Sequence, residues 1–217
     1  MAITVAEIFE RTRRLLLDEG GTRWPDAEMV DWYNEGLLDM VTRRPSLLAS
    51  IDTLACVPGT LQSVPVGRIA IIDLGQNLGS AAKPRNGGIP RSMTKDALDR
   101  MYPDWQYAST GSMVKVVVGD PNHPNQFWVF PPQPAINPGR LTITFSKRPG
   151  VVLVADIATT NFEMNDEYAP VAIEYLLYRS ELKDAENPSS GQRAAQHLQN
   201  YLGLLGVNTQ QAQPQQG

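Results

Sequence analysis

The sequence is poor in the residues that build most catalytic and metal centres. Among its 217 residues there are one cysteine, Cys56, and two histidines, His123 and His197. A disulfide bond within the chain is therefore excluded, as are zinc sites built from cysteines or from clustered histidines. Glycine-rich phosphate loops and Gly-x-Ser-x-Gly motifs are missing too. We expect no cofactor, no metal and no enzymatic activity.

Long hydrophobic runs are also missing. The longest, such as Val151–Ala155, fall far short of the roughly 18 apolar residues that a membrane-spanning helix needs. The N-terminus lacks the basic and apolar regions of a secretory signal. We therefore expect no contact with a membrane.

Charge is present but unevenly distributed. The chain has 19 basic and 23 acidic residues, a net charge of −4, made up of −3 in residues 1–44, +4 in 45–150 and −5 in 151–217. The basic centre contains no dense Lys/Arg run, so a nucleic-acid groove is not predicted. Two interpretations stay open: an ordinary solvated surface, or acidic and basic surfaces that meet between subunits and fix their register.

Local patterns predict helices at both ends and strands between them. Thr4 and Glu7 match a capping box at the start of a helix, and Pro25 suits the first turn of a second one. Of 17 prolines, 13 lie within residues 45–149, a density that excludes long helices there. Leu141, Ile143 and Phe145 alternate with polar residues as in a strand. Residues 75–91 are expected to form a long loop.

These patterns predict an α+β fold in which an antiparallel four-helix bundle from both termini carries an inserted Pro/Gly-rich antiparallel β module. The predicted parts are an N-terminal helix pair (1–48), a β-rich insertion (49–160), a C-terminal helix pair (161–206) and a Gln-rich tail (207–217). The tail is too polar to order itself alone.

Few residues suggest chemistry. Cys56 and His123 could form a catalytic dyad, but a buried cysteine and a turn histidine explain them more simply. Asp31, Glu35 and Asp39 recur every four residues on one helix face. Such a row could bind a cation, although hard cations require six or more converging oxygens, and a hydrated helix face is the simpler interpretation.

Several segments, in order along nearly the whole chain, are similar to one protein family. They are Trp24–Asp26, Trp32–Gly36, Arg43–Pro45, Leu98–Trp105, Phe127–Pro132, Tyr168–Glu186 and Arg193–Leu205. Together they resemble the head-to-tail adaptor (connector) proteins of tailed, particularly short-tailed, bacteriophages. The resemblance implies a structural virion protein, made in the host cytoplasm, that forms a ring of usually twelve subunits at the capsid vertex. That ring joins the portal to the tail nozzle or tube and extends the DNA channel, through which DNA passes without specific binding.

The resemblance also points to candidate residues. A C-terminal extension often docks on the portal in such adaptors, and the matching positions here are Val207, Asn208, Thr209, Gln210 and Gln211. Because carboxylates repel phosphates, acidic helix positions are candidates to line the lumen: Asp31, Glu35, Asp39, Glu174 and Glu181. Outward solvent exposure is the alternative. Three other functions stay open: another neck or tail-completion protein, a small hydrolase using Cys56 and His123 or a carboxylate pair, and a binding module of the host.

Overall fold

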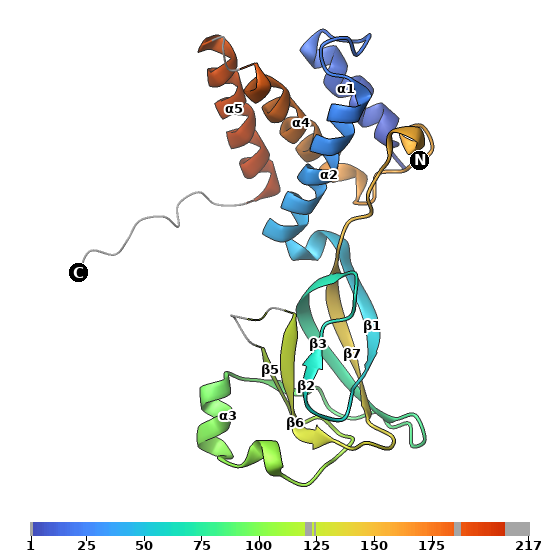
Figure 1. Ribbon diagram of the computed structural model, residues 1–217, viewed down its shortest axis with the longest axis vertical. Coiled ribbons are helices and arrows are strands. Elements are labelled where there is room, and N and C mark those ends of the chain that lie inside the picture. The colour runs from blue at the N-terminus through green and yellow to red at the C-terminus, as the bar shows by residue number, and fades with distance from the viewer. Residues whose placement is uncertain (1, 120–122, 124, 185–187, 207–217) are drawn as a thin grey trace, which may run out of the picture. The chain divides into compact units, whose positions relative to one another are not determined.

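The computed structural model describes residues 2–119, 123, 125–184 and 188–206, and it divides the chain into two compact units (Figure 1). The helical unit consists of Met1–Leu47 and Pro149–Gly217, and the β unit consists of Leu48–Arg148. Within the described residues there are five α-helices and two sheets with seven strands in all.

The helical unit contains four of these helices. They are α1 (Val5–Leu16), α2 (Asp26–Arg43), α4 (Ala169–Lys183) and α5 (Pro188–Leu205). The predicted capping box is confirmed, since Thr4 Oγ1 accepts the Glu7 N–H at 3.2 Å and Glu7 Oε2 accepts the Thr4 N–H at 2.8 Å. Short 3₁₀ turns, Val154–Asp156 and Asp166–Tyr168, precede α4.

The predicted antiparallel four-helix bundle with a β module inserted in it is wrong. Helix α4 packs against α1, α2 and α5, and a fifth helix, α3 (Lys95–Met101), belongs to the β unit. The reason is that α4 is apolar around most of its circumference, which makes it a central helix instead of one of four equivalent ones. Its buried side chains are those of Ala169, Val171, Ala172, Tyr175, Leu176, Leu177 and Ser180.

Gly36 sets the close approach of α2 to α4. A Cβ atom added at this position would lie 2.6 Å from Cδ1 of Tyr175, closer than carbon atoms pack. The Tyr175 ring in turn contacts Tyr201 of α5, with 5.2 Å between ring centroids. One glycine therefore lets the aromatic side chain of α4 pack between α2 and α5.

The β unit contains both sheets. The three-stranded sheet has the order β1-β7-β3 and the four-stranded sheet has the order β2-β6-β5-β4. The strands are β1 (Ala49–Ala55), β2 (Gly59–Ser63), β3 (Arg68–Ser80), β4 (Arg91–Ser92), β5 (Val116–Gly119), β6 (Gln126–Gln133) and β7 (Gly139–Lys147). All pairs are antiparallel except β4 with β5. Because β3 continues to Ser80, the loop expected over 75–91 is shorter than predicted.

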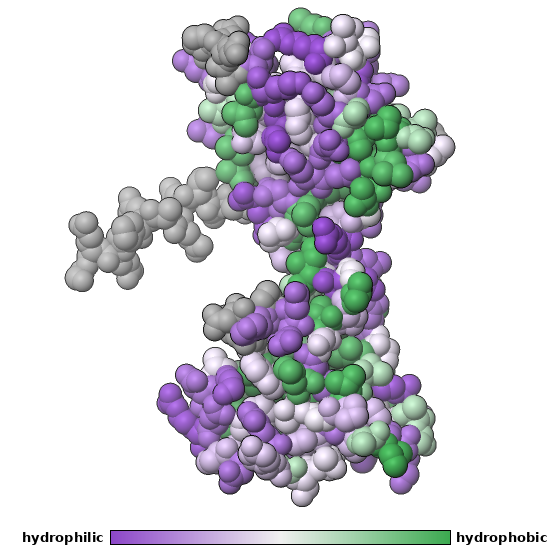
Figure 2. Space-filling model, viewed as in Figure 1, coloured by the Kyte–Doolittle hydropathy of each residue, from purple (hydrophilic) through white to green (hydrophobic). Residues whose placement is uncertain are grey.

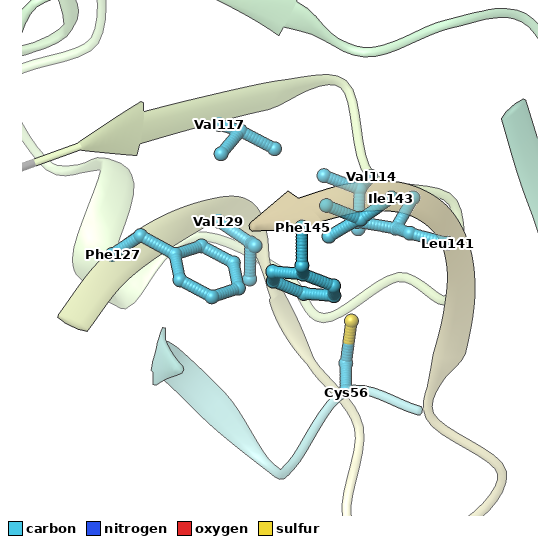
Figure 3. Close-up of a cluster of buried hydrophobic side chains, with 8 residues drawn as sticks. All are labelled: Cys56, Val114, Val117, Phe127, Val129, Leu141, Ile143 and Phe145. Atoms are coloured by element: carbon cyan, nitrogen blue, oxygen red, sulfur yellow. The ribbon is translucent and has the colours of Figure 1, made fainter. Parts of the chain in front are cut away.

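Two apolar clusters hold the β unit together. The first consists of Cys56, Val114, Val117, Phe127, Val129, Leu141, Ile143 and Phe145 (Figure 3). The second consists of Leu98, Trp105, Val116, Val118 and Phe130. Successive side chains of a strand point to opposite faces, so Val117 of β5 enters the first cluster while Val116 and Val118 enter the second. The predicted alternation of Leu141, Ile143 and Phe145 is confirmed, since all three are buried.

Candidate interaction surfaces

Four of the five predicted lumen carboxylates connect helices of the helical unit. Glu35 of α2 pairs with Arg179 of α4, and Asp39 of α2 accepts the Tyr201 hydroxyl of α5 at 2.5 Å. The other two contacts join α4 to α5: Glu174 with His197 at 2.8 Å and Glu181 with Arg193 at 2.9 Å. These carboxylates therefore position neighbouring helices, and their role at a lumen stays a prediction.

The contact between Asp39 and Tyr201 is held in one protonation state. Burial, followed by the hydrogen bond to Asp39, raises the pKa of Tyr201 above its ordinary value of 10.0. The hydroxyl therefore remains a donor at neutral pH. Arg43 shares the same carboxylate at 2.6 Å, and this hydrogen bond raises the pKa of Arg43. Asp39 thus lies between a neutral and a charged donor.

Asp31 differs from the rest of the acidic row. It is exposed on α2 and makes no ion pair with any residue that the structure describes. Its charge is therefore fully available to a partner. The five predicted portal-docking residues, Val207, Asn208, Thr209, Gln210 and Gln211, lie outside the described residues, so their role stays a prediction.

Cys56 lies in a purely apolar environment. Its side chain is buried in the first cluster of the β unit, where Figure 3 shows it beside Phe145. Burial raises the pKa of the thiol to about 11, so the nucleophilic thiolate is scarce at neutral pH. His123 lies in the turn before β6, where its carbonyl accepts the Gln126 N–H. Within the described part of the chain, no three His, Cys, Asp or Glu residues gather as a metal site would require.

The β unit has an open groove that the sequence did not reveal. Its volume is about 430 Å³, and its lining includes Ile89, Arg91, Met101, Tyr102, Lys115 and Phe130. The Tyr102 and Phe130 rings stack at 4.9 Å and also line a neighbouring hollow that includes Tyr107. Large apolar side chains are unusually exposed here, 64% for Ile89 and 89% for Tyr107. Such exposed clusters mark interaction surfaces.

Two cations border this groove. Strands β4 and β5 bring them together, because the Arg91 N–H donates to the Lys115 carbonyl at 2.9 Å. Both side chains are exposed, and neither forms an ion pair with another described residue. The groove therefore combines an apolar floor with uncompensated positive charge.

The helical unit presents an apolar ridge, Val151–Asp156, ahead of α4. Val151 and Leu153 are 71% and 60% exposed, and Val154 beside them is also exposed. Between them Val152 is buried, and its backbone forms two hydrogen bonds with the Asn34 side chain of α2, at 2.9 and 3.0 Å. Figure 2 shows a hydrophobic patch on this side of the helical unit. The Asn34 amide thus fixes the backbone of buried Val152, and the side chains of Val151 and Leu153 on either side of it are exposed.

The two units carry opposite net charge. The helical unit has 9 basic and 17 acidic residues, net −8, whereas the β unit has 10 basic and 6 acidic residues, net +4. The chain is thus an α+β protein whose candidate functional features are surfaces: the ridge, the groove and the two oppositely charged units. None of the described helices has the length and apolar composition needed to cross a membrane.

The chain belongs to the SU10 adaptor protein family, whose model matches residues 3–216. This match confirms the resemblance to bacteriophage head-to-tail adaptors, while the short-tailed class stays a prediction. The protein is accordingly a structural adaptor of the virion that contacts other virion proteins. A search of curated proteins found no match to the chain.

Proposed function

We propose that the protein assembles into a ring between the portal and the tail nozzle or tube, and that this ring extends the channel for DNA. The resemblance implies twelve subunits. The observation that carries the proposal is the family match over residues 3–216, nearly the whole chain. A ring adaptor acts through its shape and surfaces, and it needs no bond-making chemistry.

The charge of the helical unit supports a role at the channel. A net charge of −8 repels phosphates, so DNA slides past such a surface without binding to it. Glu35, Asp39, Glu174 and Glu181 share their charge with partners on neighbouring helices. Asp31 is the member of the predicted set whose charge is free of such partners, and we propose that it faces the lumen.

Residues 207–217 are proposed to dock on the portal. Their sequence is polar and rich in glutamine, and such a segment acquires structure most readily against a partner. Deleting residues 207–217 should abolish binding to the purified portal protein while leaving the far-UV circular dichroism unchanged. Undiminished binding of the truncated chain would contradict this assignment.

Electron microscopy of the assembled particle tests the proposal as a whole. We expect ring density for this chain between the portal and the tail, with carboxylates of the acidic set near the axis. Density elsewhere in the neck would favour the alternative, another neck or tail-completion protein. A ring in which none of the five carboxylates approaches the axis would contradict the lumen assignment alone.

A further inference from the structure

We propose that the apolar ridge of one copy, Val151–Asp156, docks into the groove of the β unit of the next copy. This inference rests on the proposed function, because it names the two surfaces that would hold the ring together. A ring formed by rotation needs two different surfaces on every copy, each complementary to the other. The ridge and the groove are such a pair within one chain.

The ridge and the groove both expose apolar side chains. The ridge exposes Val151, Leu153 and Val154, and the groove exposes Ile89, Met101 and Tyr102 over a volume of about 430 Å³. Burying these side chains against one another removes both apolar surfaces from water. Aliphatic side chains suit the floor of stacked Tyr102 and Phe130 rings.

The ridge and the groove are also bordered by opposite charges. Asp156 ends the ridge, and Glu163 lies beside its start, where its carboxylate accepts the Gly150 N–H at 2.7 Å. The groove is bordered by Arg91 and Lys115, which lack ion-pair partners among the described residues. The two units as wholes also carry opposite net charge, −8 for the helical unit and +4 for the β unit. Opposite charges at the edge of an apolar contact steer association and fix its register.

Hydrogen bonds within the chain hold parts of both surfaces in place. The Asn34 amide donates to the Val152 carbonyl and accepts the Val152 N–H, and these two hydrogen bonds fix the start of the ridge, which continues into the 3₁₀ turn Val154–Asp156. On the groove side, buried Trp105 donates its indole N–H to Asp99 at 2.7 Å and so fixes the segment that follows α3. A contact between two surfaces that are already ordered loses little conformational entropy when it forms.

Charge reversal on each surface tests the contact. We expect Lys115→Glu and Asp156→Lys each to weaken ring assembly of the full chain, with and without purified portal protein, by about tenfold in the protein concentration required. The variant that carries both substitutions should recover assembly, because every interface then contains the reversed pair. Lys83→Glu is the matched control, since Lys83 is an exposed cation of the β unit outside the groove lining.

The outcomes separate this inference from the proposed function. Native mass spectrometry and sedimentation measure assembly, and circular dichroism verifies that each variant is folded. If the wild-type chain forms a ring and Lys115→Glu weakens its assembly no more than Lys83→Glu does, this inference is overturned while the proposed function stands. Failure of the double variant to recover would likewise overturn it and would assign the groove to a different partner, such as the portal. If the wild-type chain forms no ring under either condition, both the proposed function and this inference fail.

Discussion

The two units of this chain both have an apolar core, but they differ in how their charged side chains are used. In the helical unit, polar pairs between helices join residues far apart in the sequence, for example Glu28 with Lys183 at 2.6 Å and Asp39 with Tyr201. The β unit depends on two apolar clusters on opposite faces of β5. Acidic residues of the helices therefore serve mainly to fix helix positions, whereas the groove cations Arg91 and Lys115 make no ion pair among the described residues. Charge that stabilises nothing within the chain is available for a partner.

The largest expected effect tests whether the units unfold separately. Phe145→Ala removes a fully buried ring from the first β cluster and should destabilise the β unit by about 3–5 kcal/mol. Phe9→Ala is the reciprocal change in α1 of the helical unit, with a similar expected cost. Hydrogen exchange read by mass spectrometry should show lost protection in the mutated unit only. Equal loss of protection in both units for either variant would mean that they form one cooperative structure.

The next effect concerns the contact between α2 and α4. Alanine has a higher helix propensity than glycine, yet Gly36→Ala should destabilise the protein by about 1–3 kcal/mol because the new Cβ would overlap the Tyr175 ring. Gly203→Ala on α5 is the control, since no atom lies within 4 Å of its Cβ position, and it should stabilise by about 0.5–1 kcal/mol. Urea denaturation measures both changes. Stabilisation by Gly36→Ala would refute the close approach of the two helices.

A smaller effect is expected where α2 meets α5. Tyr201→Phe keeps the buried ring but removes the hydroxyl that donates to Asp39, which should cost about 0.5–1.5 kcal/mol in the free energy of unfolding. Tyr178→Phe is a suitable control, because its hydroxyl makes no hydrogen bond among the described residues. Equal stability of Tyr201→Phe and the wild type in urea would show that the polar contact contributes nothing.

The smallest effect is a pH dependence of the β unit. The hydrogen bond from Arg68 lowers the pKa of Asp52 below its ordinary value of 3.8, so the folded state binds fewer protons than the unfolded state. The stability that this contact contributes is present above about pH 4 and is lost as the pH falls through the folded-state pKa. Between about pH 5 and about pH 3, the melting temperature of Asp52→Asn should fall less than that of the wild type. Asp104→Asn removes an exposed carboxylate that has no hydrogen-bond partner among the described residues, and it should leave the decline unchanged.

The sequence predicted elements whose causes are local. The capping box at Thr4 and Glu7 and the alternation of Leu141, Ile143 and Phe145 depend only on residues close in the chain. The central position of α4 was missed because the choice of neighbours is a tertiary property. The extension of β3 was missed because bulges interrupt its pairing with β7, so the strand shows no regular alternation.

The candidate surfaces show the same limit. The acidic row on α2 was visible in the sequence, but the partner of Glu35 is Arg179, which is 144 residues away. The apolar run from Val151 to Ala155 was also visible, whereas its exposure depends on Asn34 of α2. The groove combines segments on β4, α3 and β5, and no single stretch of sequence encodes it.

The entry and exit of the β unit lie side by side. Ala49, the first residue of β1, pairs with Ser146 near the end of β7, and the unit boundaries at Leu48 and Arg148 follow within two residues. Partners in an antiparallel pair are about 5 Å apart, so a short linker could join residues 47 and 149 at little cost in loop-closure entropy. The chain therefore enters and leaves the β unit at neighbouring points, and loops within the unit can vary in length without changing the spacing of those two points.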